Sequence, residues 1–201
     1  MRKCPPCPTG VDSPALDKDA VFFSWNRAHF GAWVITSSPL ILGMCKLPRL
    51  SISCATVGDS FSSSLRLHLL SADPSDEKLE PFLDVIGNAE ALAINQNWAG
   101  HPGLIIEEVP QPGSAPLNKL QLWMKLQGPR ACAVYLLNYA AAAAKHSIDF
   151  SKLKFNGTAV LGGKKVTVRD VWQRQTLPPA SGSMEVSVPA YDSALLLLTA
   201  Q

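Results

Sequence analysis

Residues 131–138 read Ala-Cys-Ala-Val-Tyr-Leu-Leu-Asn, a short apolar run that follows the turn signal Gly128-Pro129. Runs of this kind recur after Gly103, and many short strands at a spacing of about 8 to 12 residues are typical of an antiparallel sandwich or barrel. The sequence therefore predicts an antiparallel β-sandwich or barrel over residues 103–201. The predicted strands are Leu104–Glu108, Leu120–Lys125, Ala131–Asn138, Ser147–Leu153, Thr158–Leu161, Lys165–Trp172, Met184–Val188 and Ala194–Thr199.

Turn residues separate these runs at Pro110, Pro112, Pro116, Gly128-Pro129, Asn156-Gly157, Gly162-Gly163 and Pro178-Pro179. One segment conflicts with this pattern, because Ala140–Ala144 is a strong helix former between two predicted strands. We predict a loop or bulge there, with a single helical turn as the alternative. Asn156-Gly157-Thr158 is also a glycosylation sequon, which has meaning only in a secreted chain.

The first hundred residues have a different pattern. From Ala20 to Thr36 the apolar spacing predicts a helix, which Pro39 prevents from continuing. The residues predicted to share its apolar face are Phe22, Trp25, His29, Ala32 or Trp33, and Thr36. On that face, His29 is predicted to be a core histidine rather than a catalytic base. Leu40–Met44 predicts a strand buried on both faces, as in a parallel sheet covered by helices.

Residues 45–72 are rich in serine and show no sustained period. A loop of this length between a strand and a helix is uncommon, so we treat it as an insertion of doubtful structure. After Asp76, the spacing of Leu79, Phe82, Leu83 and Ile86 predicts a helix that ends at Gly87-Asn88. A second short helix is expected from Glu90 to Asn95. These elements indicate part of a βα-repeat architecture.

Composition excludes several classes of protein. Apolar residues make up 47% of the chain and charged residues 17%, a globular balance in which 18 Lys and Arg nearly offset 16 Asp and Glu. No basic run indicates nucleic-acid binding, and no apolar run is long enough to predict a membrane span. Met1-Arg2-Lys3 is followed by Cys4-Pro5-Pro6-Cys7-Pro8 in place of the apolar stretch of a signal peptide.

The sequence contains few motifs that indicate a catalytic, metal-binding or phosphate-binding site. The five cysteines, Cys4, Cys7, Cys45, Cys54 and Cys132, favour a loop disulfide or idle thiols over a zinc or redox site. Gly162-Gly163-Lys164-Lys165 is a hairpin turn rather than a phosphate-binding loop. No nucleophile elbow or His-Glu-x-x-His motif is present. The tryptophans could stack on sugars, but core or interface positions are favoured; they are Trp25, Trp33, Trp98, Trp123 and Trp172.

Several blocks resemble the α-galactosidases of glycoside hydrolase family 27. That family reads roughly R-T-H-F-x-L-W, then S-P-L-x-I-G-x-D-L, then N-x-E-x-I-A-I-N-Q, and the same order is found at Trp25–Trp33, Ser38–Met44 and Ile86–Gln96. Four later blocks look like the C-terminal sandwich of the family: Leu122–Lys125, Ala133–Asn138, Val168–Trp172 and Val186–Tyr191.

The resemblance implies a TIM (β/α)8 barrel followed by an antiparallel Greek-key β-sandwich. Ala20–Thr36 looks like barrel helix seven, Pro39–Met44 like strand eight and Asp76–Ile86 like helix eight. Residues 1–102 would then be the truncated C-terminal part of a glycosidase barrel, and residues 103–201 the second domain. Removal of residues 45–72 would join Met44 to Asp73 and restore the family pattern, so we hypothesise a retained intron or a gene-model error.

The resemblance also implies a retaining hydrolase of terminal α-galactosyl or α-N-acetylgalactosaminyl residues that needs no cofactor. Two aspartates do this chemistry, and in the family they lie in K-Y-D-x-C and R-x-x-x-D segments, with further substrate contacts in D-P-D-M-L. None of these motifs occurs in the 201 residues. No catalytic, cofactor-binding or metal-ligating residue can therefore be assigned, and we expect the chain alone to be inactive.

Two other functions remain open at this stage: a carbohydrate-binding β-sandwich module and a structural remnant without catalysis. A galactoside-type carbohydrate is the partner expected for the complete protein. Family members usually work in secreted, lysosome-like or vacuole-like compartments, but the sequence itself assigns no compartment and no oligomeric state.

Overall fold

The computed structural model describes residues 18–40, 80–112, 118–163 and 165–201. Several predictions fall outside these ranges: the strand predicted after Leu40, the insertion at 45–72, the start of the helix predicted from Asp76, and Cys4, Cys7, Cys45 and Cys54.

Among the described residues, three helices come before the strands: α1 (Lys18–Thr36), α3 (Glu80–Ile86) and α4 (Ala89–Gln96). All three were expected from the apolar spacing. Because α3 begins at Glu80, Pro81 lies in its first turn, where the amide that proline lacks would have no helical partner. No helix in the described ranges is both long and apolar enough to cross a bilayer.

Ten strands follow in the part of the chain that the structure describes, and all of their pairings there are antiparallel. Eight form one sheet in the order β1-β2-β3-β10-β7-β8-β9-β4, and β5 pairs with β6. Their bounds are β1 Leu104–Pro110, β2 Lys119–Gly128, β3 Ala131–Asn138, β4 Ala144–Asp149, β5 Lys154–Phe155, β6 Thr158–Ala159, β7 Lys165–Asp170, β8 Gln175–Ser181, β9 Ser183–Val188 and β10 Ser193–Ala200.

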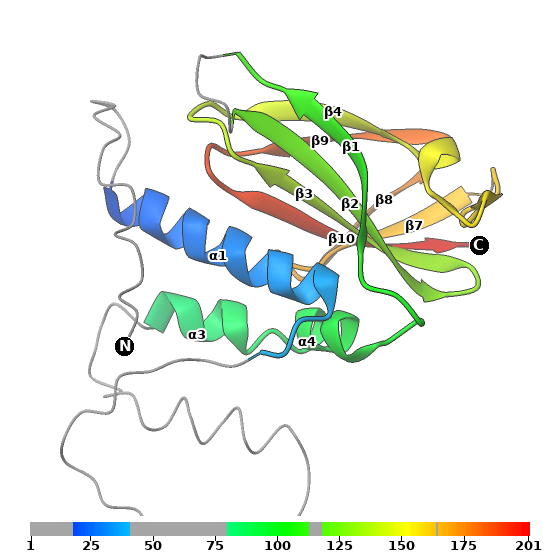
Figure 1. Ribbon diagram of the computed structural model, residues 1–201, viewed down its shortest axis with the longest axis horizontal. Coiled ribbons are helices and arrows are strands. Elements are labelled where there is room, and N and C mark those ends of the chain that lie inside the picture. The colour runs from blue at the N-terminus through cyan, green and yellow to red at the C-terminus, as the bar shows by residue number, and fades with distance from the viewer. Residues whose placement is uncertain (1–17, 41–79, 113–117, 164) are drawn as a thin grey trace, which may run out of the picture.

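The order β10-β7-β8-β9 is a Greek key, because three consecutive strands are followed by a fourth that returns beside the first of them. The sheet folds over so that β4 and β9 lie behind β1 and β2 (Figure 1). Glu107 of β1 lies near the other edge of the sheet: its Oε2 is 3.2 Å from Nζ of Lys152, just after β4, and 3.7 Å from Nε2 of His146 in β4. The predicted Greek-key β-sandwich is thus present.

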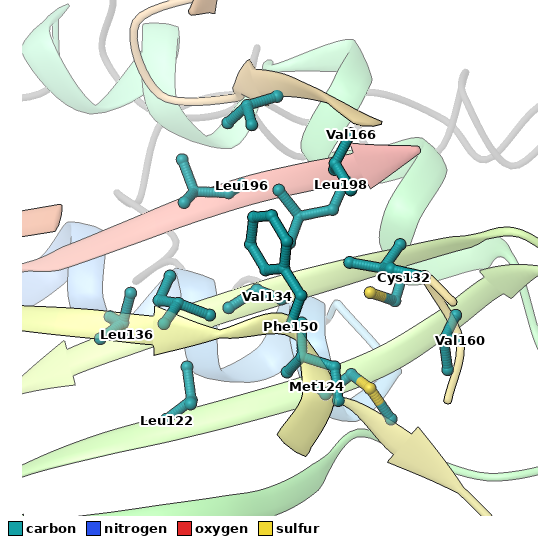
Figure 2. Packing of buried hydrophobic residues seen from close by; sticks show 14 of the residues in the cluster. Leu122, Met124, Cys132, Val134, Leu136, Phe150, Val160, Val166, Leu196 and Leu198 are labelled. Carbon is teal, nitrogen blue, oxygen red and sulfur yellow. The ribbon is translucent and has the colours of Figure 1, made fainter. Parts of the chain in front are cut away.

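Alternating side chains of the central strands serve two separate cores. On β3, Cys132, Val134 and Leu136 point into the sandwich and pack with Leu122 and Leu196, as Figure 2 shows. Ala133, Tyr135 and Leu137 point to the opposite face. Successive side chains of a strand alternate between faces, so β3 is buried on both sides.

The helices form a layer over that opposite face of the sheet, as α1 and α3 show in Figure 1. Ala28, Val34 and Ile35 of α1 and Ile94 of α4 pack with Tyr135 and its neighbours into one core. The helical segment and the sandwich therefore share an apolar core.

The predicted apolar face of α1 is wrong in part: Ala32 and Trp33 pack against the core, but three other residues do not. Phe22 is 61% and Trp25 41% exposed, and His29 is exposed as well, so it is not a core histidine. The helix is apolar around most of its circumference, and the side with small residues faces the sheet because Ala28 and Gly31 permit a close approach.

Two strands were missed, the two-residue β5 (Lys154–Phe155) and β8. The pair Pro178-Pro179 was interpreted as a break between strands, but it lies within β8. Between Val166 and Val168 the β7–β8 register shifts at these prolines, and β8 pairs with β9 only at Ser181 and Ser183. Proline lacks an amide donor and is tolerated at such irregular positions.

Several strand boundaries also differ from the prediction, most of all those of β4. The strand predicted from Ser147 to Leu153 begins earlier, at Ala144, and ends at Asp149, whose carboxylate accepts from Ser151 N and starts a 3-10 turn. Residues 140–143 form a loop, as predicted, despite their helical propensity. Asn138 holds that loop, because its amide donates to Ala142 O at 2.8 Å.

Gly31→Ala tests the close approach of α1 to the sheet. A Cβ on Gly31 would lie 2.5 Å from Tyr135 Cε2 and 3.1 Å from Trp172 Cζ2. Tyr135 is fully buried and its hydroxyl donates to Ala28 O, so its ring has nowhere to move. We expect a loss of about 1–3 kcal/mol in the free energy of unfolding, as for other overpacked sites.

Denaturant titration measures this loss, and His29→Ala on the exposed side of the same helix is the control, with an expected change within about 0.5 kcal/mol. Equal stability of the two variants would contradict the close packing.

Candidate functional site: the interface between helices and sandwich

Asn88 joins α4 to the end of β7. Its side-chain oxygen accepts from Glu90 N at 3.0 Å and Ala91 N at 3.2 Å, which caps the helix. Its amide nitrogen donates to Val171 O at 2.8 Å. Asn88 is buried, so each of these bonds replaces one to water. Residues of the Asn88–Gln96 block thereby contact the Val168–Trp172 block.

Glu90 and Arg169 make a second link between these blocks. The guanidinium donates Nε to one carboxylate oxygen at 3.0 Å and Nη2 to the other at 2.7 Å. This bidentate hydrogen bond lowers the pKa of Glu90 below its usual value, against a smaller opposing effect of burial. Both side chains are about one third exposed, so the pair orients α4 more than it stabilises the fold.

Each of the other two helices has its own arginine–carboxylate link to the sandwich. Arg27 of α1 donates to both carboxylate oxygens of Asp192, which is almost fully buried just before β10. Arg174 donates to Asp84 of α3 at 2.6 Å. All three helices thus carry one such contact, and a planar guanidinium fixes direction as well as distance.

A buried lysine donates hydrogen bonds to the C-terminus of α4. Lys125 of β2 donates its ammonium to Ile94 O and to Asn95 O, two carbonyls that the helix leaves without an internal partner. No carboxylate within the described residues forms an ion pair with it. Burial lowers the pKa of Lys125 from 10.5 to about 8.

Asn95 extends this contact to the end of α1. Its amide donates to Trp33 O at 3.1 Å and to Ser38 O at 3.0 Å. Ser37 Oγ donates to Asn95 O at 2.9 Å. The side chain of Asn95 therefore connects the C-terminal ends of both helices.

Three of the described carboxylates are held in the charged form by hydrogen bonds. A glycosidase general acid needs a raised pKa, whereas the pKa values of Glu90, Glu108 and Asp149 are all lowered by hydrogen bonds. No group of three or more His, Cys, Asp or Glu side chains in the described ranges is placed to hold a metal ion.

The tryptophans divide into two sets. Trp33, Trp123 and Trp172 are half-buried against the core between helices and sheet, as predicted. Trp25 and Trp98 are 41% and 60% exposed. Trp25 stacks on Tyr191 with ring centroids 5.7 Å apart, and its edge approaches Tyr139 at 6.1 Å.

Sequence reasoning missed Arg27, Lys125 and Asp192 as interface residues. Lys125 lies in the same strand as the apolar residues Leu122 and Met124. A lysine in such a strand is normally expected to point into solvent. Arg27 and Asp192 lie 165 residues apart, and nothing in their local sequence connects them. The resemblance of Trp25–Trp33 and Ile86–Gln96 to family blocks was the available signal, because both blocks contribute to this interface.

A family model described as the α-galactosidase C-terminal β-sandwich domain matches residues 118–198. Residues 118–198 are therefore similar to an α-galactosidase C-terminal β-sandwich domain. No curated protein sequence matches the chain significantly.

Solved structures extend the likeness to the helical segment. α-Galactosidase I from Mortierella vinacea is 20% identical with a TM-score of 0.62, over 95% of this chain and 39% of its own. α-Galactosidase from Saccharomyces cerevisiae is 14% identical with a TM-score of 0.64, over 89% and 44%. A family 27 β-L-arabinopyranosidase from Geobacillus stearothermophilus is 17% identical with a TM-score of 0.60, over 89% and 31%. At these identities the likeness is one of fold.

The chain therefore spans less than half the length of each of these proteins. It resembles the C-terminal part of a family 27 α-galactosidase, as the sequence blocks indicate.

Asn88→Ala tests the joint between α4 and β7. The change removes the helix cap and leaves Val171 O without its side-chain donor, so we expect a loss of about 1–3 kcal/mol in the free energy of unfolding. Asn97→Ala in the same segment removes an exposed amide and should cost no more than about 0.5 kcal/mol. Chemical denaturation followed by tryptophan fluorescence measures both, and an equally small loss for Asn88→Ala would contradict the role of the joint.

Lys125 predicts an unusual pH dependence of stability. Because its pKa falls from 10.5 to about 8 on folding, the unfolded chain binds more protons at this residue between these two values. The free energy of unfolding therefore rises with pH across that window, by about 3 kcal/mol in total for a shift of this size.

Burial raises the pKa of Cys132 from 9.0 to about 12, which lowers stability as the pH rises above 9. The Lys125 effect is therefore measured between pH 8 and 9, as the difference between the parent protein and Lys125→Met. The exposed Lys145→Met is the control and should keep the parent slope. A parent slope retained in Lys125→Met would contradict the prediction.

Proposed function

We propose that this chain is the C-terminal part of a family 27-type glycoside hydrolase, in which residues 103–201 are the second domain and residues 1–102 belong to the end of a (β/α)8 barrel. The observation that carries the proposal is the match of residues 118–198 to the α-galactosidase sandwich domain. The folds of the Mortierella vinacea and Saccharomyces cerevisiae α-galactosidases support it over most of the chain.

The helical layer supports the barrel assignment. Phe22 and Trp25 of α1 are 61% and 41% exposed, although Phe22 packs edge-on against Phe82 of α3 and Trp25 stacks on Tyr191. Large apolar side chains left exposed on a helix favour a contact with further protein. In a complete barrel, neighbouring elements would cover them. Residues 45–72 remain an insertion in this proposal, with a retained intron or gene-model error as its origin.

In this proposal the described residues have a structural role and not a catalytic one. Arg27, Asn88, Glu90, Asn95 and Arg169 hold the helical segment against the sandwich through the contacts described above. The complete protein would hydrolyse terminal α-galactosyl residues of a carbohydrate substrate without a cofactor. The 201 residues alone would not, because the family's aspartate motifs do not occur in them and a retaining glycosidase needs both carboxylates.

The proposal is tested by incubating the purified 201-residue protein with p-nitrophenyl α-galactoside. We expect no release of p-nitrophenol above the uncatalysed rate, while loss of a general acid alone lowers glycosidase rates by about 10²–10⁴. An intact family 27 enzyme measured at the same molar concentration fixes the sensitivity. Galactose release that co-purifies with the chain would overturn the assignment of the catalytic groups to other segments.

The exposed stack of Trp25 on Tyr191 favours the second candidate, a carbohydrate-binding module without catalysis. Aromatic rings of this kind bind the apolar faces of sugars. A glycan array separates the two candidates. Saturable binding that is lost in Trp25→Ala and kept in Trp98→Ala would favour the module, and the absence of binding would favour the structural role.

A further inference from the structure

Asn156 lies at the tip of a two-residue hairpin turn. β5 and β6 pair through Phe155 and Thr158, and the two residues between them, Asn156 and Gly157, have φ values of 48° and 78°. Positive φ at both central positions is characteristic of the type I′ turn, for which Asn-Gly is the preferred sequence. The turn therefore fixes the direction in which the Asn156 side chain leaves the backbone.

The surroundings of this turn are open. Asn156, Gly157 and Thr158 are all exposed, and a Cβ built on Gly157 would meet no heavy atom within 4 Å. No hydrogen bond within the described residues involves the Asn156 side chain. The base of the hairpin, in contrast, is held in place: the Phe155 ring stacks on His101 with centroids 4.1 Å apart.

Asn156-Gly157-Thr158 has the Asn-x-Thr sequence of an N-glycosylation acceptor with a residue other than proline at its centre. Among the asparagines of the printed sequence, Asn156 alone is followed two residues later by serine or threonine. The turn accounts for Asn156 and Gly157, but it places no demand on a hydroxyl at residue 158.

We propose that Asn156 is a glycan acceptor site of this protein, modified when the chain enters a compartment that contains an oligosaccharyltransferase. The donor is a lipid diphosphate-linked oligosaccharide. A bond forms between the Asn156 amide nitrogen and the anomeric carbon of the sugar, the bond from that carbon to the diphosphate oxygen breaks, and the amide loses one proton as the lipid diphosphate leaves.

The site is distinct from the interface between helices and sandwich. Its residues take no part in the contacts of Asn88, Asn95, Lys125 or Arg27. A bulky, hydrated group at the hairpin tip would therefore extend into solvent without displacing any of them.

The test is translation of the full chain, preceded by a cleavable signal peptide, in the presence of microsomes, with signal-peptide removal as proof of entry. We expect one discrete increase in apparent mass that peptide-N-glycosidase reverses. Thr158→Ser should keep the shift and Thr158→Val should abolish it. Asn156→Asp should also abolish it, and this variant preserves the hairpin because Asp-Gly suits the same turn.

Ser181→Asn in the Asn156→Asp chain is the matched control. It creates the acceptor pattern at residues 181–183, where Ser181 and Ser183 are exposed and Gly182 has a φ of 77°. If this control is modified and the parent chain is not, the proposal is overturned. A shift that persists in Asn156→Asp would overturn it equally.

A second measurement tests the placement in the fold. Peptide-N-glycosidase should release the glycan from the native protein at about the rate found for the denatured chain, because the hairpin tip is exposed. Release that requires denaturation would contradict the exposed placement of the hairpin tip.

Discussion

The two-sided burial of β3 and β10 is the constraint on which the other features of the structure depend. Each strand sends alternate side chains into the sandwich core and into the core beneath the helices. Neither core is complete without both strands, because Tyr135 and Leu195 serve one and Val134 and Leu196 the other. The helical layer and the sandwich are for this reason coupled in stability, and polar contacts such as that of Asn88 with Val171 add direction to a joint that apolar burial already forms.

The sequence blocks that resemble the α-galactosidase family supply polar contacts between the helices and the sandwich. They lie where α1, α4 and β7 meet, and they supply a helix cap, a bidentate ion pair and an amide that connects two helix ends. These are requirements of geometry rather than of reaction chemistry. Asn88 and Asn95 must offer a donor and an acceptor at fixed positions, and Arg169 must present a planar guanidinium to Glu90.

Much of the sandwich was predictable because its strands are short, apolar and separated by Gly and Pro. β8 was not, since Pro178 and Pro179 are strong breaking signals whose tolerance depends on a register shift in the partner strand. The buried side of α1 was also beyond local reasoning. That helix is apolar on most sides, and contact is decided by the small residues Ala28 and Gly31 opposite Tyr135. Long-range polar pairs such as Arg27 with Asp192 leave no periodic trace in the sequence at all.

The position of β10 in the sheet has a consequence for how the protein is made. This strand is synthesised after every other described strand, yet it lies between β3 and β7 at the centre of the sheet. A nascent chain can form the β1-β2-β3 meander early. The strand that joins this meander to β7 is β10, and it is missing until Ser193–Ala200 have left the ribosome. Until then, the apolar side chains of β3 and of the sheet-facing side of α1 stay exposed to solvent. Exposed apolar surface of this kind is bound by chaperones and causes incomplete chains to aggregate. Loss of a few residues from this strand would therefore be far more damaging than the same loss from β1 or β4 at the edges.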